Sequence, residues 1–160
     1  MMAIGIDPGT VRTGYGVVRR DGARFLRLAS GAIRTHSKTP MGERLLAIHN
    51  GLEQLLATFA PEEAAVEDIF FSRNPRSVLK LGQVRGVILV VLEKRGIPVA
   101  SYAPAFVKRA VVGGGQAAKG QMQRVVQAML GMAETPGEDE ADALAIAICH
   151  LNAPRLPVLR

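Results

Sequence analysis

Short apolar runs separated by turn residues open the chain and predict β-strands. Residues 2–7 have the pattern of a buried strand, which Pro8 and Gly9 end. Two further strands are expected over residues 13–18 and 24–34, with a tight hairpin between them at Asp21 and Gly22. Three strands joined by short turns form an antiparallel meander.

After residue 40 the apolar residues recur at helical spacing. The pattern predicts helices over residues 40–59, 75–95, 104–111, 119–130 and 136–150. Two short apolar strands are expected between helices, over residues 64–67 and 97–102. Strands connected through helices run parallel with right-handed crossovers.

The order of these elements predicts an α/β fold. We expect a mixed five-stranded sheet with an antiparallel first three-strand meander, flanked by helices on both faces. Residues 1–160 would form a single domain, with residues 152–160 as a frayed tail. Ligand sites in open sheets of this kind form at the carboxyl ends of the strands.

Composition supports a globular protein, since 48% of the residues are hydrophobic and 21% are charged. No run approaches the roughly 20 apolar residues of a membrane span, and the N-terminus lacks the pattern of a signal peptide. The single cysteine, Cys149, has no partner for an internal disulfide. These features predict a cytoplasmic protein without a membrane segment.

The charge is positive and unevenly distributed. Twenty Lys and Arg residues stand against fourteen Asp and Glu, which gives a net charge of +6. Two segments lack acids altogether, and their basic residues are Arg73, Arg76, Lys80, Arg85, Lys94, Arg95, Lys108, Arg109, Lys119 and Arg124. A merely solvated surface is the alternative, but segregation over this much chain favours a phosphate-binding face.

Two carboxylates end apolar strands, where burial of a charge is costly. Asp7 closes the first strand and Glu67 closes the strand over residues 64–67. Asp7 is alternatively a turn-capping residue, and Glu67 an acid that faces water at a strand end.

A third acidic position lies at the start of the last helix. Thr135 and Glu138 have the spacing of a capping box around Pro136, and this explains Glu138. It does not explain Asp142, which shares one helix face with Asp139 amid apolar residues.

The acids at the two strand ends and on the helix face are explained if they meet at one site. These acids are Asp7, Glu67, Asp139 and Asp142. Like charges that close require cations between them. Oxygen ligands without a His or Cys cluster indicate Mg²⁺, with Mn²⁺ able to substitute. Two such ions about 3.5–4 Å apart clamp in-line displacement at a phosphodiester, so the pattern predicts a two-metal nuclease.

Four segments of the chain resemble the RuvC family. They are Ile-Gly-Ile-Asp-Pro-Gly-Thr-Val-Arg-Thr-Gly-Tyr-Gly-Val at 4–17, Val-Glu-Asp-Ile-Phe at 66–70, Leu-Lys-Leu-Gly-Gln-Val-Arg-Gly at 79–86 and Asp-Glu-Ala-Asp-Ala-Leu-Ala-Ile-Ala-Ile at 139–148. The family consists of Holliday-junction resolvases, crossover junction endodeoxyribonucleases of the ribonuclease H-like superfamily. The resemblance extends over residues 3–150.

This resemblance implies a homodimer that nicks two strands of a four-way DNA junction symmetrically, leaving 5′-phosphate and 3′-hydroxyl ends. The family's metal ligands map onto Asp7, Glu67, Asp139 and Asp142, the third of which is a His in some members. DNA contacts map onto Phe70, Arg73, Arg76, Lys108 and Lys119. Phe70 would distort the junction, and Lys119 would give electrostatic support near the scissile phosphate. The expected partner is a branch-migration complex of the RuvA and RuvB type.

Three other functions remain open. The segment from Gly5 to Thr10 also resembles the first phosphate motif of sugar-kinase and actin-like ATPases, which need two such domains. A different ribonuclease H-like nuclease, or a junction-binding protein without catalysis, would share many of these features. Cleavage assays on a four-way junction, linear duplex, hybrid and ATP would separate them.

Overall fold

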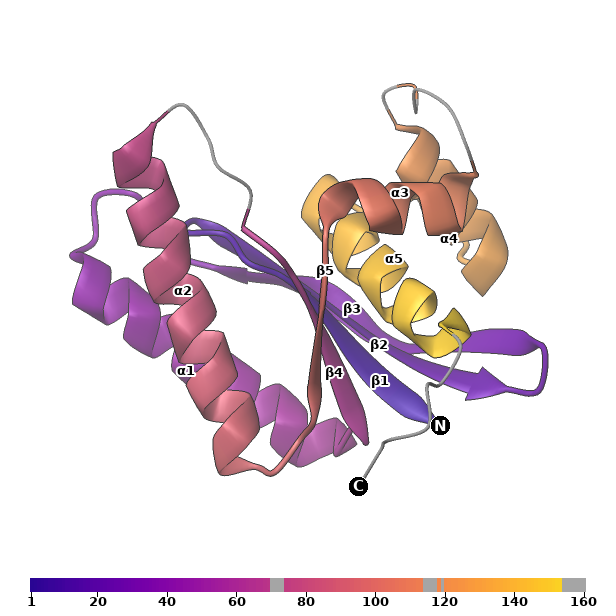
Figure 1. Ribbon diagram of the computed structural model, residues 1–160, viewed down its shortest axis with the longest axis horizontal. Coiled ribbons are helices and arrows are strands. Elements are labelled where there is room, and N and C mark those ends of the chain that lie inside the picture. Colours follow the sequence, from indigo (N-terminus) through magenta and orange to yellow (C-terminus); the bar gives the residue numbers. More distant parts are fainter. Residues whose placement is uncertain (70–73, 114–117, 119, 154–160) are drawn as a thin grey trace.

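The computed structural model describes residues 1–69, 74–113, 118 and 120–153 (Figure 1). The elements follow the predicted order: β1 (Met2–Asp7), β2 (Arg12–Asp21), β3 (Arg24–Arg34), α1 (Met41–Phe59), β4 (Glu63–Glu67), α2 (Pro75–Lys94), β5 (Val99–Tyr102), α3 (Pro104–Val112), α4 (Gln121–Leu130) and α5 (Glu138–Asn152). Within the described residues, none of the helices is both long and apolar enough to cross a membrane.

The five strands form one mixed sheet in the order β3-β2-β1-β4-β5. β2 pairs antiparallel with both β1 and β3, whereas β4 pairs parallel with both β1 and β5. The predicted meander and the parallel strands are therefore confirmed. Because of these directions, β1, β4 and β5 end at the same edge of the sheet, where β2 begins and β3 ends. We call this the carboxyl edge.

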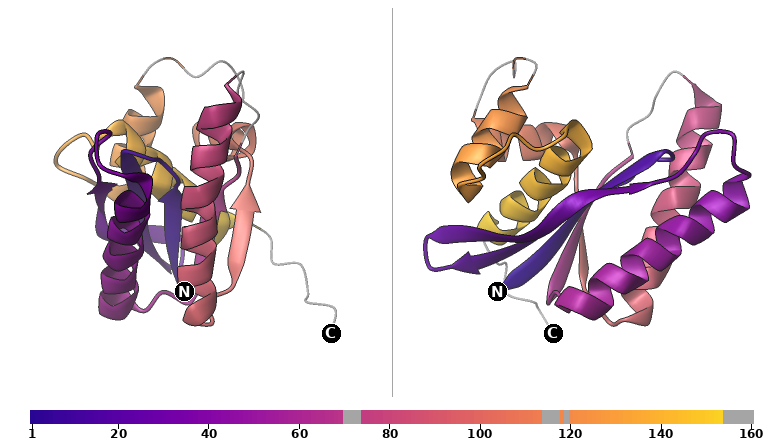
Figure 2. Two further views of the ribbon diagram at one scale, coloured as in Figure 1. Left: turned by 90° about the vertical axis from the view of Figure 1, so that its left-hand side faces the viewer. Right: turned by 180° about the vertical axis from the view of Figure 1, so that it is seen from behind.

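Helices cover both faces of the sheet, as predicted (Figures 1 and 2). Ile4 and Ile6 of β1 are buried in one core with residues of α1 and α2. Ala3 of the same strand is buried in the second core, which contains residues of α3, α4 and α5. The alternation of side chains along β1 thus feeds two separate cores.

Glycines allow α5 to lie unusually close to the sheet. A Cβ atom at Gly5 would stand 2.1 Å from the carbonyl oxygen of Ala143, and one at Gly14 would stand 2.1 Å from that of Asp139. Real Cβ atoms essentially never come so near to backbone atoms. The small residues of β1 and β2 therefore fix the position of the first turns of α5 over the carboxyl edge.

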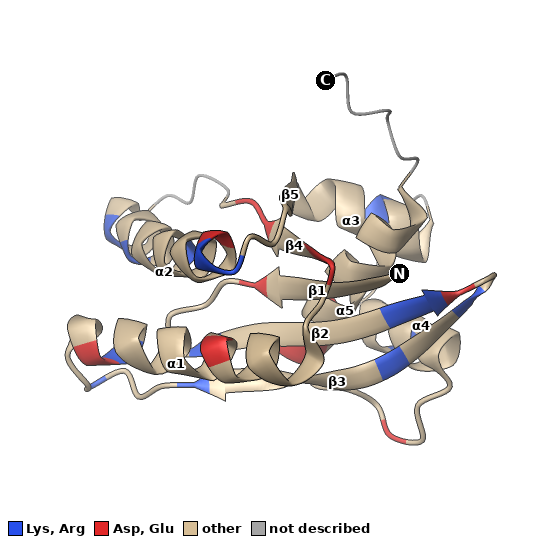
Figure 3. Ribbon diagram, turned by 90° about the horizontal axis from the view of Figure 1, so that it is seen from below, with Lys and Arg blue, Asp and Glu red and all other residues tan. Residues whose placement is uncertain are grey.

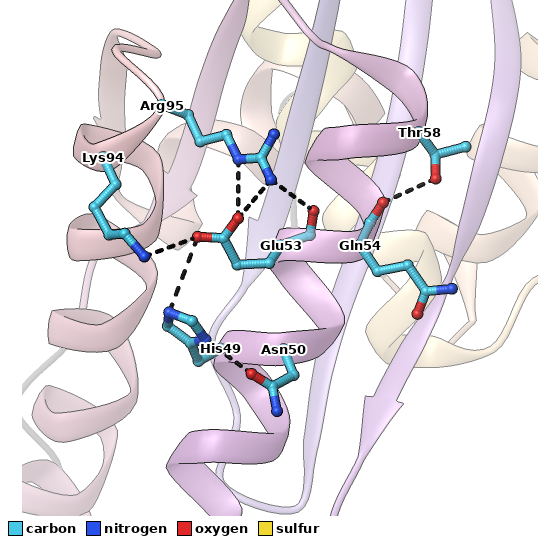
Figure 4. A network of polar contacts seen from close by, with 7 residues as sticks. All are labelled: His49, Asn50, Glu53, Gln54, Thr58, Lys94 and Arg95. Atoms are coloured by element: carbon cyan, nitrogen blue, oxygen red, sulfur yellow. Dashed lines mark hydrogen bonds and ion pairs between the residues drawn. The ribbon is translucent and has the colours of Figure 1, made fainter.

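A charged cluster joins the end of α2 to the middle of α1 (Figure 4). The carboxylate of Glu53 accepts hydrogen bonds from Arg95 Nη2 at 2.6 Å and Nε at 2.9 Å, and from Lys94 Nζ at 3.2 Å. These hydrogen bonds, first of all those from Arg95, lower the pKa of Glu53. The cluster lies at the surface, so it fixes the geometry of the helix pair more than it stabilises the fold.

The predicted start of the last helix is wrong by two residues. α5 begins at Glu138, and the capping side chain belongs to Glu140, which accepts a hydrogen bond from the Gly137 amide at 3.3 Å. The carbonyl of Pro136 instead accepts from Gln123 Nε2 at 2.9 Å. The Thr135 hydroxyl donates to Gln127 Oε1 of α4 at 2.9 Å, so Thr135 and Glu138 do not form the expected capping box.

Other boundaries differ by up to three residues, since β2 extends to Asp21 rather than to residue 18 and β5 begins at Val99 rather than at residue 97. α4 begins at Gln121 rather than at residue 119. The frayed tail was predicted for residues 152–160, but Asn152 still belongs to α5 and residues 154–160 lie outside the described part.

Candidate functional site

Asp7 and Glu67 end two neighbouring parallel strands at the carboxyl edge. Their predecessors Ile6 and Val66 are paired in register, so the two acids lie side by side. Acidic residues mark the ends of both β1 and β4 in Figure 3. The carboxyl groups of Asp7 and Glu67 are close enough for the charge of Glu67 to raise the pKa of Asp7.

Asp139 and Asp142 come from the first turns of α5. Gly14, whose backbone touches that of Asp139, is the partner of Asp7 in the antiparallel register. This contact brings the helix start next to the strand ends, and the charges of Asp139 and Asp142 both raise the pKa of Asp7. The structure therefore brings together the four acids that the sequence singles out.

The electrostatics of this carboxylate cluster are unfavourable in the absence of a cation. Burial and then the charges of the other three acids raise the pKa of Asp7 from 3.8 to about 8. Burial first, and Asp142 second, raise the pKa of Glu67. Burial also raises the pKa of Asp142, with Asp139 and Glu138 adding to it. At neutral pH, Asp7 consequently keeps a proton that a metal ligand would have to release.

The donor set fits a hard divalent cation. Its members are carboxylates, which are the ligands that such a cation prefers. Burial and mutual repulsion disfavour their ionised forms, and a positive ion would relieve both effects. Among the described residues, no group of three or more Asp, Glu, His or Cys side chains already has the arrangement of a metal site. Binding of a cation would therefore require these carboxylates to move into ligand positions.

Lys108 of α3 stands beside the carboxylate cluster. It lines a cavity of about 170 Å³ with Glu67 and Asp142, and an adjoining cavity of about 230 Å³ with Asp142 and Glu138. Its charge lowers the pKa of Glu67 and of Asp142, against the effect of burial. Because Lys108 is exposed, its ammonium group is open to a ligand that enters these cavities.

The turn after Asp7 is held by a residue that sequence reasoning missed. Arg44 is only 6% exposed, and its guanidinium donates to the carbonyl oxygen of Thr10 and to the hydroxyl of Thr35. The Thr35 hydroxyl also donates to the Thr10 carbonyl, at 2.7 Å. Thr13 Oγ1 donates to the Gly9 carbonyl at 2.9 Å. Arg44 thus connects α1 to the segment that follows Asp7.

A sequence signal for the burial of Arg44 was present. The residue precedes Ile48, Leu52 and Leu56 at intervals of four along the buried face of α1. Extending this apolar face by one helical turn places position 44 in the interior. A buried Arg at such a position needs acceptors, which the turn provides.

The acid-free segments are less available to phosphates than their sequence indicates. Arg85 Nη2 donates to Asp68 at 3.1 Å and to Ser101 at 2.7 Å. Lys94 and Arg95 are bound to Glu53, as described above. These three side chains therefore have carboxylate partners within the fold, and a phosphate would have to compete with those partners for them.

The predicted DNA-contact residues are only partly placed. Arg76 is exposed in the first turn of α2, where its backbone amide donates to the Asn74 side chain at 3.0 Å. Lys108 lies beside the carboxylate cluster, as described above. Phe70, Arg73 and Lys119 lie outside the described residues.

Comparisons with known proteins agree over nearly the whole chain. The family model for the crossover junction endodeoxyribonuclease RuvC matches residues 3–150. Proteins of that name from Chloroflexus aggregans and Geobacter sp. (strain M21) are 49% and 44% identical, over 98% and 99% of this chain and 96% and 97% of their own. The structure of Thermus thermophilus RuvC in complex with a Holliday junction substrate superposes with a TM-score of 0.88 at 39% identity, covering 94% of this chain and 93% of that one.

Proposed function

The chain belongs to the RuvC family of crossover junction endodeoxyribonucleases, and we propose that it resolves Holliday junctions through the carboxylates of Asp7, Glu67, Asp139 and Asp142. Such a nuclease would serve DNA recombination and repair in the cytoplasm. The related T. thermophilus structure, which holds a junction substrate, supports four-way DNA as the ligand.

One observation carries the proposed chemistry: three of the four carboxylates are buried deeply enough for their pKa values to be raised. A protein gains no stability from such a cluster unless a cation enters it. We therefore assign two Mg²⁺ ions to the site, with Mn²⁺ as a substitute. When bound, these ions would supply a nucleophile at neutral pH and neutralise charge at the scissile phosphate.

The protein's own groups orient the substrate around this centre. The Lys108 ammonium faces the same cavity as Glu67 and Asp142, so it can pair with an oxygen of the phosphate to be cut. Lys119 would add positive charge nearby, and Arg73 and Arg76 would hold the backbone of the DNA arms. Phe70 would unstack bases at the crossover, three residues beyond Glu67.

Symmetric cleavage requires two copies of the chain, and α2 offers a surface for their contact. Leu79 and Val90 are 70% and 58% exposed on one face of this helix. Gly82 and Gly86 lie between them on the same face, and a Cβ atom at either would meet nothing within 4 Å. Ile69 and Val78 border a groove of about 500 Å³ beside Leu79. Small residues flanked by apolar ones permit close packing of two helices, so this face is our candidate for the homodimer contact.

Junction resolution also implies a protein partner. A RuvA- and RuvB-type branch-migration complex would present the junction to the dimer. The alternative functions are another ribonuclease H-like nuclease and a non-catalytic junction binder. The carboxylate cluster argues against the second alternative, because unneutralised acids at the binding face repel DNA phosphates.

Cleavage assays test the proposal directly. The chain is incubated with a labelled four-way junction, a linear duplex and an RNA–DNA hybrid, in Mg²⁺, Mn²⁺ or EDTA. We expect paired nicks in the junction with either metal and none in EDTA, and Glu67→Gln and Asp142→Asn should lose cleavage but retain binding. Asp21→Asn, at an exposed turn, is the control for loss of one acid. Preference for the hybrid, or cleavage in EDTA, would overturn the proposal.

A further inference from the structure

Two arginines stand next to each other at the carboxyl edge, on the opposite side of the carboxylate cluster from Lys108. Arg12 begins β2 and Arg34 ends β3, and the two residues are direct partners in the antiparallel register. Partners in such a register project from the same face of the sheet. Both side chains are exposed.

The face in question is the one that α5 covers. Arg12 Nη1 lies 3.8 Å from Asp139 Oδ2. Further along β3, the hydroxyl of Ser30 donates to Glu140 at 2.5 Å, which fastens the strand to the same helix. Arg12 and Arg34 therefore lie beside the first turn of α5, which carries Asp139.

The positive charges of Arg12 and Arg34 have little compensation from the residues that the structure describes. Like charges directly opposite one another on paired strands repel. Arg12 has one carboxylate within ion-pair distance, at the upper end of the range, and 58% of its side chain remains exposed. In the described part of the chain, the Arg34 side chain makes no hydrogen bond or ion pair. Of the two guanidinium groups, only that of Arg12 has a described carboxylate within ion-pair distance, so a polyanion would supply the missing negative charge.

From these contacts we infer that Arg12 and Arg34 form a second phosphate-binding pair, which holds the backbone of a junction arm on the β3 side of the carboxylate cluster. Guanidinium groups bind phosphate oxygens with two parallel hydrogen bonds, which suits paired arginines. The inference rests on the proposed function, because it extends the same DNA surface. Arg12 and Arg34 on the β3 side and Lys108 on the β5 side would then contact the DNA backbone on both sides of the scissile phosphate.

The salt dependence of junction binding tests the inference. Binding is measured in EDTA, so that cleavage and the metal site do not contribute, for wild type, Arg34→Ala, and Arg12→Ala with Arg34→Ala. The control combines Arg19→Ala with Arg24→Ala, which removes the same charge from exposed positions of the same strands at their far ends. A further variant, Arg34→Lys, keeps the positive charge but cannot make the two parallel hydrogen bonds of a guanidinium group.

Each lost phosphate contact should lower the log–log salt slope by about 0.9. The slope should therefore fall by about 0.9 in the single variant and by about 1.8 in the double variant. When salt is raised from about 50 to about 200 mM, the double variant should then lose roughly 12-fold less affinity than wild type loses. The control pair should keep the wild-type slope, and Arg34→Lys should recover part of it. Because repulsion is relieved, the melting temperature of Arg34→Ala should equal or exceed that of wild type.

Two outcomes would overturn the inference, and they are distinguishable. If wild type binds and cuts the junction but the double variant shows the wild-type slope or matches the control pair, the pair does not contact DNA and the proposed function stands. If wild type itself neither binds nor cuts four-way junctions, the proposed function fails and the inference fails with it.

Discussion

Replacing Asp7 by Asn should make the metal-free protein more stable while it destroys the metal site. The pKa of Asp7 is raised from 3.8 to about 8, because the carboxyl group is buried among other acids. Between these two values the folded protein holds a proton that the unfolded chain has released. Stability contributed by this group is thus fully present below about pH 4, and it falls as pH rises until the folded group ionises near pH 8.

The pKa difference sets the size of the effect. One pKa unit corresponds to about 1.4 kcal/mol, so the penalty accumulated by pH 7 is at most about 4 kcal/mol. Asn keeps the shape and can donate its amide hydrogen to Glu67, but it never ionises. For a chain of 160 residues, 1 kcal/mol shifts the melting temperature by about 2–4 °C, so we expect a rise of several degrees at pH 7 in EDTA.

Thermal unfolding at several pH values and metal concentrations measures the difference in stability between Asp7→Asn and wild type. In EDTA, the gap between Asp7→Asn and wild type should widen from pH 5 to pH 8. Added Mg²⁺ should raise the melting temperature of wild type and leave that of Asp7→Asn unchanged, since a bound ligand stabilises the state that binds it. Asp21→Asn, in an exposed turn, should follow wild type throughout. A variant that is less stable than wild type at every pH would refute the account of a strained carboxylate cluster.

Three further predictions concern two supports of the site and the expected DNA contact Phe70. Arg44→Met should cost about 1–3 kcal/mol, because the Thr10 carbonyl loses its buried donor, and should slow junction cleavage well beyond an Ile48→Val variant of similar stability. Gly14→Ala should cost about 1–3 kcal/mol and raise the Mg²⁺ concentration needed for half-maximal cleavage, since the methyl group pushes α5 outward. Phe70→Ala should slow cleavage of an intact junction and recover on a junction with unpaired bases at its crossover; equal loss on both substrates would make the ring structural.

The mixed sheet and its antiparallel meander follow closely from the sequence. The strand over residues 24–34 was predicted with its observed bounds, because Gly22 and Asp21 mark the hairpin before it. The helix starts were less predictable. α5 begins at Glu138 because Gln123 holds the Pro136 carbonyl, and no local pattern reveals a contact made across thirteen residues.

The carboxylate cluster was predictable because its acids interrupt apolar patterns in the sequence. The residues that hold the surrounding backbone and pair with nearby charges were not predictable in this way. Asp7 and Asp142 are conspicuous in sequence, since each follows or interrupts a buried run. The pairing of Asp68 with Arg85 joins residues from different elements, so counting charges along the chain could not reveal it. Tertiary contacts, rather than local pattern, decide which basic side chains remain free for phosphate.

Separating junction binding from junction cleavage in one variant tests the central claim most directly. Wild type and Asp7→Asn are mixed in excess with a labelled four-way junction, and affinity and single-turnover cleavage are recorded in the same Mg²⁺ buffer. We expect Asp7→Asn to retain junction binding, because the basic residues expected to contact the DNA backbone are unchanged, and to make no nicks, because it has lost a metal ligand. Nicking by Asp7→Asn at the wild-type rate would show that the carboxylate cluster is not the catalytic centre.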